Sequence, residues 1–561
     1  MHTTSYVAHT DGIPYLYING IKQNGLAYIT YLTKQNRYSD FANAGYRLFS
    51  VPVFFGYNHL NEHSGLHVFT KGIFDTDTPD FSVFDADIEM ILEACPDAYI
   101  LPRVNVSVSR TWELDHPDEL CNAYPDGTPG RASFASERWA SDIKNHLAVF
   151  LSHISESAYA ARIAGYQIAG GNTEEWLPLD KNGISGPCAQ EAYHRYLCTH
   201  AVQDSDSEFY RFYSELVADR ICEFAAEVKK LTEYRLAVGS FYGYTLECPE
   251  RTSGHHALQR VLECNDIDFI CSPISYSMTR TIGRDHPYMI PFASIRHHGK
   301  LYFSENDTRT HLSRPVNDMA WYNGPIWFGP DRNTTCDIIK LHAARAYFNN
   351  HAAWWFDMWG GWFADPAYME LLQKIHTLFS QKHTQPCGSL TESAVFVDEK
   401  AYALLSDTSV SRPVCNQIRE ALGKMSAPYD MYLASDAEAV IDRYKAVIAL
   451  IPIASPNNDR LLELAEAKQI PILTIQQSNA DISGEALRAF LRQSGVHIWC
   501  EHDAVIYADK NSVFLHTTAN AAYTLQFPEC STPLHDCFSG NEFVQGSDLP
   551  YGKSFWLRYR S

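Results

Sequence analysis

Strand-like and helix-like segments alternate along this chain up to about residue 385, and this alternation limits the fold more than any other feature. Eight short apolar runs have the composition of strands that are buried on both faces. Mainly helical patterns, such as residues 137–157 and 208–230, separate them. The runs cover residues 26–31, 46–54, 98–106, 164–170, 235–241, 268–274, 300–304 and 352–356. We therefore predict an α/β fold with a (β/α)8 barrel, whose functional side chains stand at the carboxyl ends of the strands.

Two smaller domains are predicted after the barrel. Between residues 390 and 500 the strand and helix patterns continue but shorten, which is typical of a small doubly wound α/β domain. Its first strand is not followed by a Gly-rich phosphate loop, so we expect no nucleotide there. Residues 501–561 contain short alternating runs, which indicate a small antiparallel β domain. The expected division is therefore 1–385, 390–500 and 501–561.

Composition and charge exclude several classes of function. The formal net charge of −21 argues against binding to nucleic acid or to an anionic membrane, both of which need a positive surface. The start of the chain is polar and no run of 18 apolar residues occurs, so we expect neither a secretion signal nor a membrane span. The 14 cysteines form no C-x-x-C pair, which favours reduced thiols in a cytoplasmic protein. The aromatic share of 13% suits sugar binding, because sugar C–H faces stack on aromatic rings.

Carboxylates follow two of the predicted barrel strands. The fourth run continues as Gly-Gly-Asn-Thr-Glu-Glu-Trp, with Glu174 and Glu175 beside Trp176, and the seventh run ends in Glu305. Strands four and seven of one barrel bring such residues to opposite sides of the same mouth. Hydrolysis of a glycosidic bond with retention needs a proton donor and a carboxylate nucleophile roughly 5–5.5 Å apart. The sequence therefore predicts a retaining glycosidase.

The roles of the acidic residues follow from their surroundings. We expect Glu305 to be the nucleophile, kept ionised by Arg103 and Tyr276 at neighbouring strand ends, although Arg103 could equally be a structural ion-pair partner. Adjacent residues point in different directions, so only one of Glu174 and Glu175 can face Glu305. We prefer Glu175 as the acid/base, because Trp176 would provide the dry wall that raises the pKa of a proton donor.

Other residues could contact the sugar. Asn172 could bind a sugar hydroxyl, or it could simply be a turn residue after two glycines. The aromatic run 351–363 places Trp355, Asp357 and Trp359 where they could form the floor of a sugar pocket, although part of this run could instead be core. Two histidine pairs, at 255–256 and 297–298, lack a third ligand at metal spacing. We expect neither a bound metal nor a cofactor.

A barrel with Glu after strands four and seven, followed by an α/β domain and a small β domain, resembles the clan A retaining glycoside hydrolases. It is most similar to the family 42 β-galactosidases and the related family 164 β-mannosidases. Residues 394–402 (AVFVDEKAY) and 427–433 (APYDMYL) resemble their trimerisation domain. The resemblance implies Glu305 as nucleophile, the Glu174/Glu175 pair as acid/base, and a homotrimer. Two features depart from it: the residue before the two glutamates is Thr173 rather than Asn, and the zinc-binding cysteines of some family 42 members have no counterpart.

The sequence thus predicts a cytoplasmic, metal-independent exo-β-glycosidase that acts on terminal β-linked sugars, with a β-galactoside as first choice and a β-mannoside as second. A different class remains open, namely a non-catalytic carbohydrate-binding or assembly protein on a degenerate barrel. Transglycosylation or phosphorolysis would use the same carboxylates.

Overall fold

A computed structural model describes residues 3–57, 71–123, 125, 127, 129–171, 173–178, 184–313, 329, 331–384, 389–527 and 533–558. Eight parallel strands close into a barrel within it. In chain order they are β4 (Leu26–Thr30), β5 (Leu48–Phe54), β6 (Tyr99–Asn105), β7 (Gly165–Ala169), β8 (Ala237–Phe241), β9 (Phe269–Pro273), β10 (Leu301–Asn306) and β11 (Ala352–Asp357). The predicted barrel is confirmed, and each predicted strand end lies within two residues of the observed one.

The barrel strands are apolar throughout because both of their faces are covered. Every residue of β7, β8 and β9 is buried, by packed side chains inside the barrel and by helices outside it. Packing is tight enough to require glycine at one position of β8. A Cβ atom on Gly239 would stand 2.2 Å from the ring of Phe269 in β9. A side chain there would push the two strands apart.

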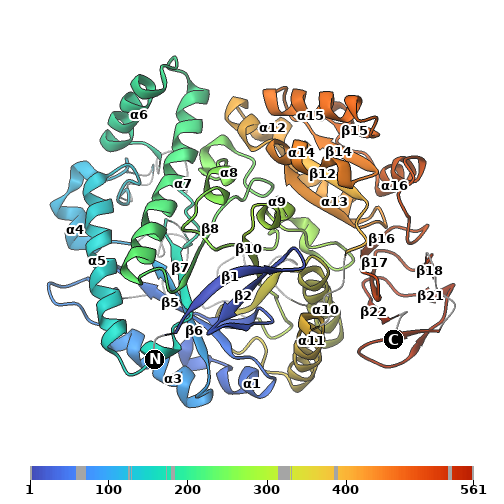
Figure 1. The fold of residues 1–561 in the computed structure, drawn as a ribbon, viewed down its shortest axis with the longest axis horizontal. Helices are drawn as coiled ribbons and strands as arrows, with labels where there is room; N and C mark the ends of the chain where they lie inside the picture. Colours follow the sequence, from blue (N-terminus) through green and yellow to red (C-terminus); the bar gives the residue numbers. More distant parts are fainter. Residues whose placement is uncertain are drawn as a thin grey trace.

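Helices form the outer layer of the barrel (Figure 1). They include α3 (Ser82–Ala94), α5 (Glu137–Glu156), α7 (Asp206–Leu231), α10 (Arg332–Phe348) and α11 (Pro366–Thr384). Helix α5 begins where the hydroxyl of Ser136 accepts a hydrogen bond from Trp139 N. It buries Trp139, Ile143, Leu147 and Phe150, which recur at helical spacing on its inner face.

A three-stranded sheet at the start of the chain was not predicted. It consists of β1 (Ser5–Thr10), β2 (Ile13–Ile18) and β3 (Ile21–Lys22), and it crosses the barrel in Figure 1. The Ser5 hydroxyl donates to Ala164 O (2.5 Å) and accepts from Ala237 N (2.8 Å). Those residues stand where β7 and β8 begin. The sheet therefore covers the amino-terminal end of the barrel, opposite the carboxyl ends that carry the acidic residues.

The middle of the chain forms a parallel four-stranded sheet in the order β13-β12-β14-β15. Its strands are β12 (Ser393–Val397), β13 (Tyr429–Leu433), β14 (Ala446–Leu450) and β15 (Ile472–Ile475), with helices that include α13 (Arg419–Gly423), α15 (Pro456–Ala467) and α16 (Gly484–Gln493). The chain starts inside the sheet and extends it to both sides, as a doubly wound fold does. Glu399, which follows β12, accepts from Leu258 N and Gln259 N at the start of α8 (Leu258–Leu262). This contact joins the middle domain to the barrel.

The end of the chain forms an antiparallel five-stranded sheet, as predicted. Its order is β16 (Ala504–Ala508), β17 (Ser512–Thr517), β22 (Ser554–Arg558), β19 (Leu534–Asp536) and β20 (Glu542–Phe543), and β18 (Ala521–Tyr523) pairs separately with β21 (Ser547–Leu549). The sheet packs on α10: the hydroxyl of Ser554 donates to Asp337 O (2.7 Å), and Trp556 contacts the ring of Phe348.

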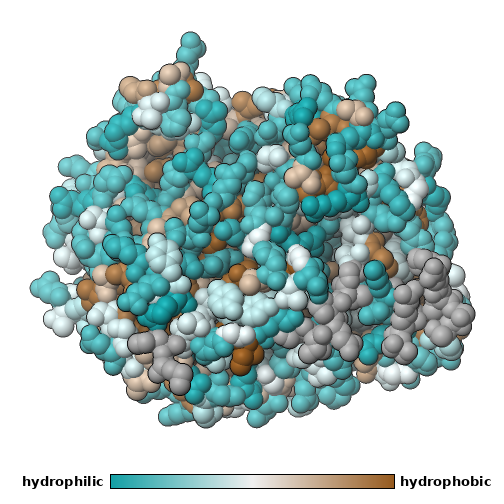
Figure 2. Space-filling model, viewed as in Figure 1, coloured by the Kyte–Doolittle hydropathy of each residue, from teal (hydrophilic) through white to brown (hydrophobic). Residues whose placement is uncertain are grey.

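The surface in the view of Figure 2 is mostly hydrophilic, with apolar residues gathered over part of the middle domain. None of the helices that the structure describes is long and apolar enough to cross a membrane.

Candidate active site

Glu305 stands near the end of β10 and is only 3% exposed. Two donors meet its Oε2 atom: Arg103 Nη2 at 2.8 Å and Trp354 Nε1 at 3.0 Å. Trp354 is the register partner of Glu305 on β11, so its indole reaches the carboxylate directly. Burial raises the pKa of Glu305, whereas Arg103 and the hydrogen bond from Trp354 favour its ionised form.

Arg103 links the carboxylates from within the barrel. It lies on β6 with 1% exposure, and its Nε atom donates to Gln167 Oε1 on β7 (3.1 Å). Besides Glu305, its guanidinium reaches Glu174 Oε2 (3.6 Å) and the hydroxyl of Tyr31 (3.3 Å). Burial opposes its charge, but the neighbouring carboxylates raise the pKa of Arg103 above its usual value. One buried guanidinium thus serves both sides of the mouth.

The turn after β7 places two adjacent glutamates differently. Three residues that are not glycine have left-handed backbone conformations: Thr173 (φ 53°), Glu174 (φ 70°) and Trp176 (φ 61°). Such conformations cost on the order of 1–3 kcal/mol each and persist only where the surroundings enforce them. Here Trp176 N donates to Gly170 O (2.7 Å), and the fully buried indole donates to Ser240 Oγ (3.0 Å). The buried tryptophan therefore holds the turn.

Glu175 is the half-buried member of the doublet. Its Oε1 accepts from the hydroxyl of Tyr244 (2.9 Å) and its Oε2 from the hydroxyl of Thr173 (2.6 Å). Burial, followed by the charge of Glu305, raises the pKa of Glu175 to about 8. At neutral pH the group is therefore mainly protonated, as a general acid must be.

Glu174 is more deeply buried, with 2% exposure. Its Oε2 accepts a hydrogen bond from Tyr31 and lies beside Arg103, whereas its buried Oε1 has no hydrogen-bond partner among the described residues. Burial raises the pKa of Glu174 to about 7, and Arg103 opposes the rise. Glu174, Glu175 and Glu305 surround one guanidinium, and the repulsion between three negative charges opposes the ionisation of all three. The cluster therefore retains protons at neutral pH.

Tyr276 follows β9, and its hydroxyl donates to Asp307 Oδ2 (2.8 Å). Asp307 stands two residues after Glu305 and forms ion pairs with Arg309 (2.6 Å) and Arg280 (3.3 Å). Its charge contributes to the raised pKa of Glu305. Tyr276 therefore acts on Glu305 indirectly, through its hydrogen bond to Asp307.

The structure does not bring Trp355 and Asp357 to the carboxylates. Successive residues of β11 face opposite sides, and these two lie on its outer face. The indole of Trp355 donates to the hydroxyl of Tyr46 (3.0 Å). Asp357 accepts from the hydroxyl of Tyr28 (2.8 Å) and from two backbone N–H groups of the following loop. Trp354 occupies the inward position that we had expected for its neighbour.

Sequence reasoning missed Tyr31, Tyr244, Trp354 and Asn105. Tyr31 follows β4 directly and Tyr244 follows β8 by three residues, so aromatic residues just beyond strand ends were an available signal. Asn105 ends β6, and within the part of the chain that the structure describes neither polar atom of its buried amide has a hydrogen-bond partner. It lines a small cavity together with Gly171. Asn172, the predicted hydroxyl contact, lies outside the described residues.

Tyr31 also lines a larger cavity of about 380 Å³. Residues that follow β4, together with β5 and α3, line it. The indole of Trp359 lies 6.0 Å from the ring of Tyr31, so this residue of the predicted aromatic floor does approach the mouth. Tyr31 thus contacts Glu174 and also lines a space that is large enough for a small ligand.

No histidine side chain in the described ranges forms a hydrogen bond with the carboxyl group of Glu174, Glu175 or Glu305. His255 and His256 are buried core residues, and burial lowers their pKa values to about 3 and about 4. His255 Nδ1 accepts from Tyr244 N (3.2 Å). Among the described residues, one group could hold a metal ion: His297, His298 and Asp436. His298 Nε2 lies 2.8 Å from Asp436 Oδ1, so an ion pair already accounts for this contact.

No protein-family model matches the sequence, and no curated protein matches it. Solved structures do match along nearly the whole chain. A β-galactosidase from Bacillus circulans sp. alkalophilus superposes with a TM-score of 0.61 at 12% identity, over 95% of this chain and 98% of that one. The family 42 β-galactosidase Gan42B gives 0.61 at 10% identity, with both chains fully covered. The chain has the fold of the family 42 β-galactosidases.

A family 42 exo-carrageenase from Bacteroides ovatus shares this fold, with a TM-score of 0.61 at 11% identity over 99% of this chain and 84% of that one. The predicted resemblance is thus confirmed at the level of architecture. At identities of 10–12% the likeness establishes the fold alone.

Proposed function

We propose that the chain is a retaining β-glycosidase that removes a terminal β-linked sugar by double displacement. This proposal rests on one observation: the carboxyl groups at the mouth of the barrel have surroundings that favour different protonation states. Glu305 accepts from a guanidinium and an indole, whereas the pKa of Glu175 is raised to about 8. A nucleophile must be ionised and a proton donor must be protonated, and these surroundings favour that division.

The proposed reaction has two steps. Glu175 first gives its proton to the glycosidic oxygen while Glu305 attacks the anomeric carbon. The bond between that carbon and the glycosidic oxygen breaks, the aglycone leaves as an alcohol, and a glycosyl ester of Glu305 remains. Arg103 and Trp354 both donate to Oε2 of Glu305, so Oε1 is the atom placed to attack. Glu175, now ionised, then takes a proton from water as the water attacks the same carbon. The ester bond breaks, and Glu305 is regenerated as a carboxylate.

The remaining polar atoms of the mouth are candidates for sugar hydroxyl contacts. Glu174 Oε1 and the amide of Asn105 are buried and find no hydrogen-bond partner among the residues that the structure describes, so a bound sugar could satisfy them. We place Glu174 in substrate positioning rather than in proton transfer, because Tyr31 and Arg103 already hold its other oxygen. The matched structures include β-galactosidases, which makes a β-galactoside our first candidate. A β-mannoside is our second, because the sequence also resembles the family 164 β-mannosidases.

We further propose a homo-oligomer, with a trimer as the first expectation. The edge strand β15 supports this, because Ile470, Ile472 and Leu473 remain partly exposed there. Exposed apolar edges of this kind commonly pair or pack with a partner. Light scattering after gel filtration would give three times the 63.5 kDa chain mass for a trimer. A mass of one chain at micromolar concentration would rule out the oligomer.

A panel of aryl β-glycosides tests the proposed activity. We expect the wild type to hydrolyse at least one of them, and Glu305→Gln and Glu175→Gln to lose most of that turnover. Glu156→Gln, on the exposed side of α5, is the matched control and should behave as wild type. Tight sugar binding without turnover of any glycoside would instead identify a non-catalytic carbohydrate-binding protein.

A further inference from the structure

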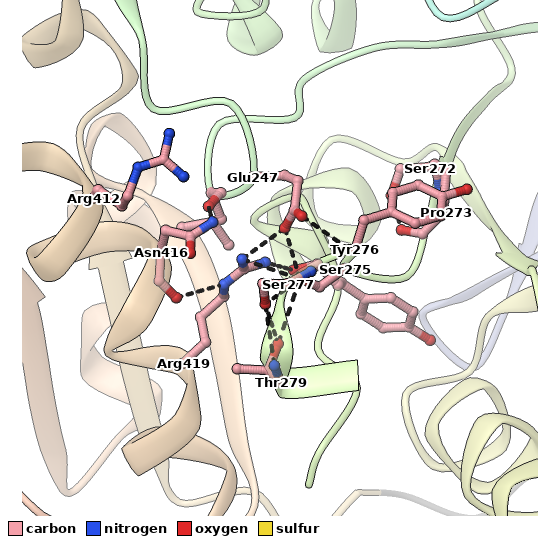
Figure 3. A network of polar contacts seen from close by, with 12 residues as sticks. Glu247, Ser272, Pro273, Ser275, Tyr276, Ser277, Thr279, Arg412, Asn416 and Arg419 are labelled. Atoms are coloured by element: carbon pink, nitrogen blue, oxygen red, sulfur yellow. Dashed lines mark hydrogen bonds and ion pairs between the residues drawn. The ribbon is translucent and has the colours of Figure 1, made fainter. Parts of the chain in front are cut away.

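A buried arginine of the middle domain reaches into the barrel (Figure 3). Arg419 is the first residue of α13 and is fully buried. Its Nη2 atom donates to Glu247 Oε2 (2.6 Å) and to Ser275 Oγ (3.2 Å). The other guanidinium nitrogens donate to backbone oxygens, Nη1 to Tyr288 O (3.0 Å) and Nε to Asn416 O (2.9 Å). Three of these four acceptors belong to the barrel.

Glu247 connects the two loops that follow β8 and β9. It lies on the β8 loop, where its backbone N donates to Tyr244 O (3.0 Å). Its carboxylate accepts from the β9 loop, at Tyr276 N (2.9 Å) and Ser275 Oγ (2.7 Å). The dashed contacts of Figure 3 show this carboxylate between Arg419 and the β9 loop. One carboxylate thus fixes the relative positions of two active-site loops.

Each loop carries a tyrosine that contacts an acid of the mouth. Tyr244 donates to Glu175 Oε1, and Tyr276 donates to Asp307 beside Glu305. We propose that Arg419 is a positioning residue of the active site, which acts through Glu247 on Tyr244 and Tyr276. This inference rests on the proposed glycosidase function. It implies that the middle domain completes the catalytic site.

The strength of the link follows from charge and burial. A charge-assisted hydrogen bond is roughly twice as strong as a neutral one. Without the guanidinium, the largely buried carboxyl group of Glu247 would have only neutral donors, and Ser275 would lose one partner. The two loops would then relax toward separate positions. Misplacement of catalytic groups by about 1 Å can cost on the order of 100-fold in rate.

A second contact between the domains provides a matched control. Arg296 of α9 (Phe292–His297) pairs with Asp430 of β13 at 3.1 Å. This ion pair also joins the barrel to the middle domain, but it lies on the helix before β10 and not on either loop. Arg419→Met and Arg296→Met both remove a guanidinium from the domain interface. Only the first should affect the two loops.

Hydrogen–deuterium exchange tests the mechanical part without any substrate. In Arg419→Met we expect faster exchange across residues 243–248 and 275–279, and in Arg296→Met we expect wild-type exchange there. Arg419→Lys keeps the positive charge but loses the planar set of N–H donors, so it should also show faster exchange in both loops. It replaces Arg419→Met in this test if the methionine variant folds poorly. Unchanged exchange in both loops would overturn the proposal, whether or not the protein hydrolyses glycosides.

Kinetics test the catalytic part on the substrate that the wild type turns over. We expect kcat of Arg419→Met to fall by about 10- to 100-fold with a smaller change in KM, and the loss to shrink in a Tyr276→Phe background. A purely structural arginine would give additive losses or none. Faster exchange in both loops of Arg419→Met with an unchanged kcat would contradict the proposed positioning role of Arg419. A wild type without turnover would defeat the proposed function, and the exchange data alone would then decide whether Arg419 holds the loops.

Discussion

The two sides of the barrel mouth present their carboxylates by different means. Glu305 belongs to β10, a regular strand whose register with β11 aligns it with Trp354. Glu174 and Glu175 instead follow β7 on a turn with three left-handed residues that are not glycine. A strand places a side chain by alternation alone, whereas the conformation of the turn depends on the buried Trp176. The turn gives the two adjacent glutamates different hydrogen-bond partners.

The largest expected effect is on the strand side. Glu305→Gln removes the proposed nucleophile while it keeps the volume of the side chain, so we expect kcat to fall by at least about 1,000-fold. Steady-state kinetics on the best aryl glycoside of the panel measure it. A loss of less than tenfold would mean that another residue attacks the anomeric carbon.

On the turn side, the two neighbouring glutamates should separate by role. Glu175→Gln should lower kcat by about 100- to 10,000-fold, most strongly for substrates with poor leaving groups, because the proton donor is lost. Glu174→Gln should mainly raise KM, since its side chain is expected to contact the substrate. If the loss of kcat depended on the leaving group in Glu174→Gln but not in Glu175→Gln, the two assignments would be reversed.

The two faces of β11 give a smaller and cleaner contrast. Trp354→Phe removes a hydrogen bond to Glu305, and we expect about a tenfold loss of kcat/KM. Trp355→Phe removes a hydrogen bond to Tyr46 on the outer face and should lower the free energy of unfolding by about 1 kcal/mol with little change in activity. Denaturant titration and kinetics on both variants measure the contrast. Equal activity losses would show that the faces are not separated as described.

The smallest effect is a shift in pH dependence. Because the pKa of Glu175 is raised to about 8, activity should be present below that pH and be lost as the pH rises through it. The hydrogen bond from Tyr244 favours the ionised form of Glu175 and so lowers its pKa. Tyr244→Phe should therefore move the alkaline limb of kcat/KM to higher pH. A limb that moves to lower pH would exclude Glu175 as its origin.

The sequence predicted the parts of the molecule that depend on strand periodicity. The eight apolar runs, the doubly wound sheet and the placement of Glu305 next to Arg103 all follow from buried strands with charges at their carboxyl ends. Trp355 and Trp354 show the limit of this reasoning, because a strand buried on both faces contains no alternation that tells inside from outside. The positions of Glu174 and Glu175 depend on the left-handed φ angles of the turn and on the burial of Trp176 against β8. A local sequence pattern encodes neither of these. The first sheet, β1–β3, was missed, although Leu16 and Ile18 of β2 are buried in the same apolar core as the barrel strands, alongside polar contacts such as that of Ser5.

Covalent trapping tests the central claim most directly. A 2-deoxy-2-fluoro glycoside with an activated leaving group, matched to the sugar that the wild type accepts, should form a stable ester with the nucleophile because the second step is slowed. Mass spectrometry of the digested protein should then show one fluorosugar on the peptide that contains Glu305. A label on Glu174, Glu175 or any other residue would contradict the account, and so would turnover of the natural glycoside with inversion at the anomeric carbon.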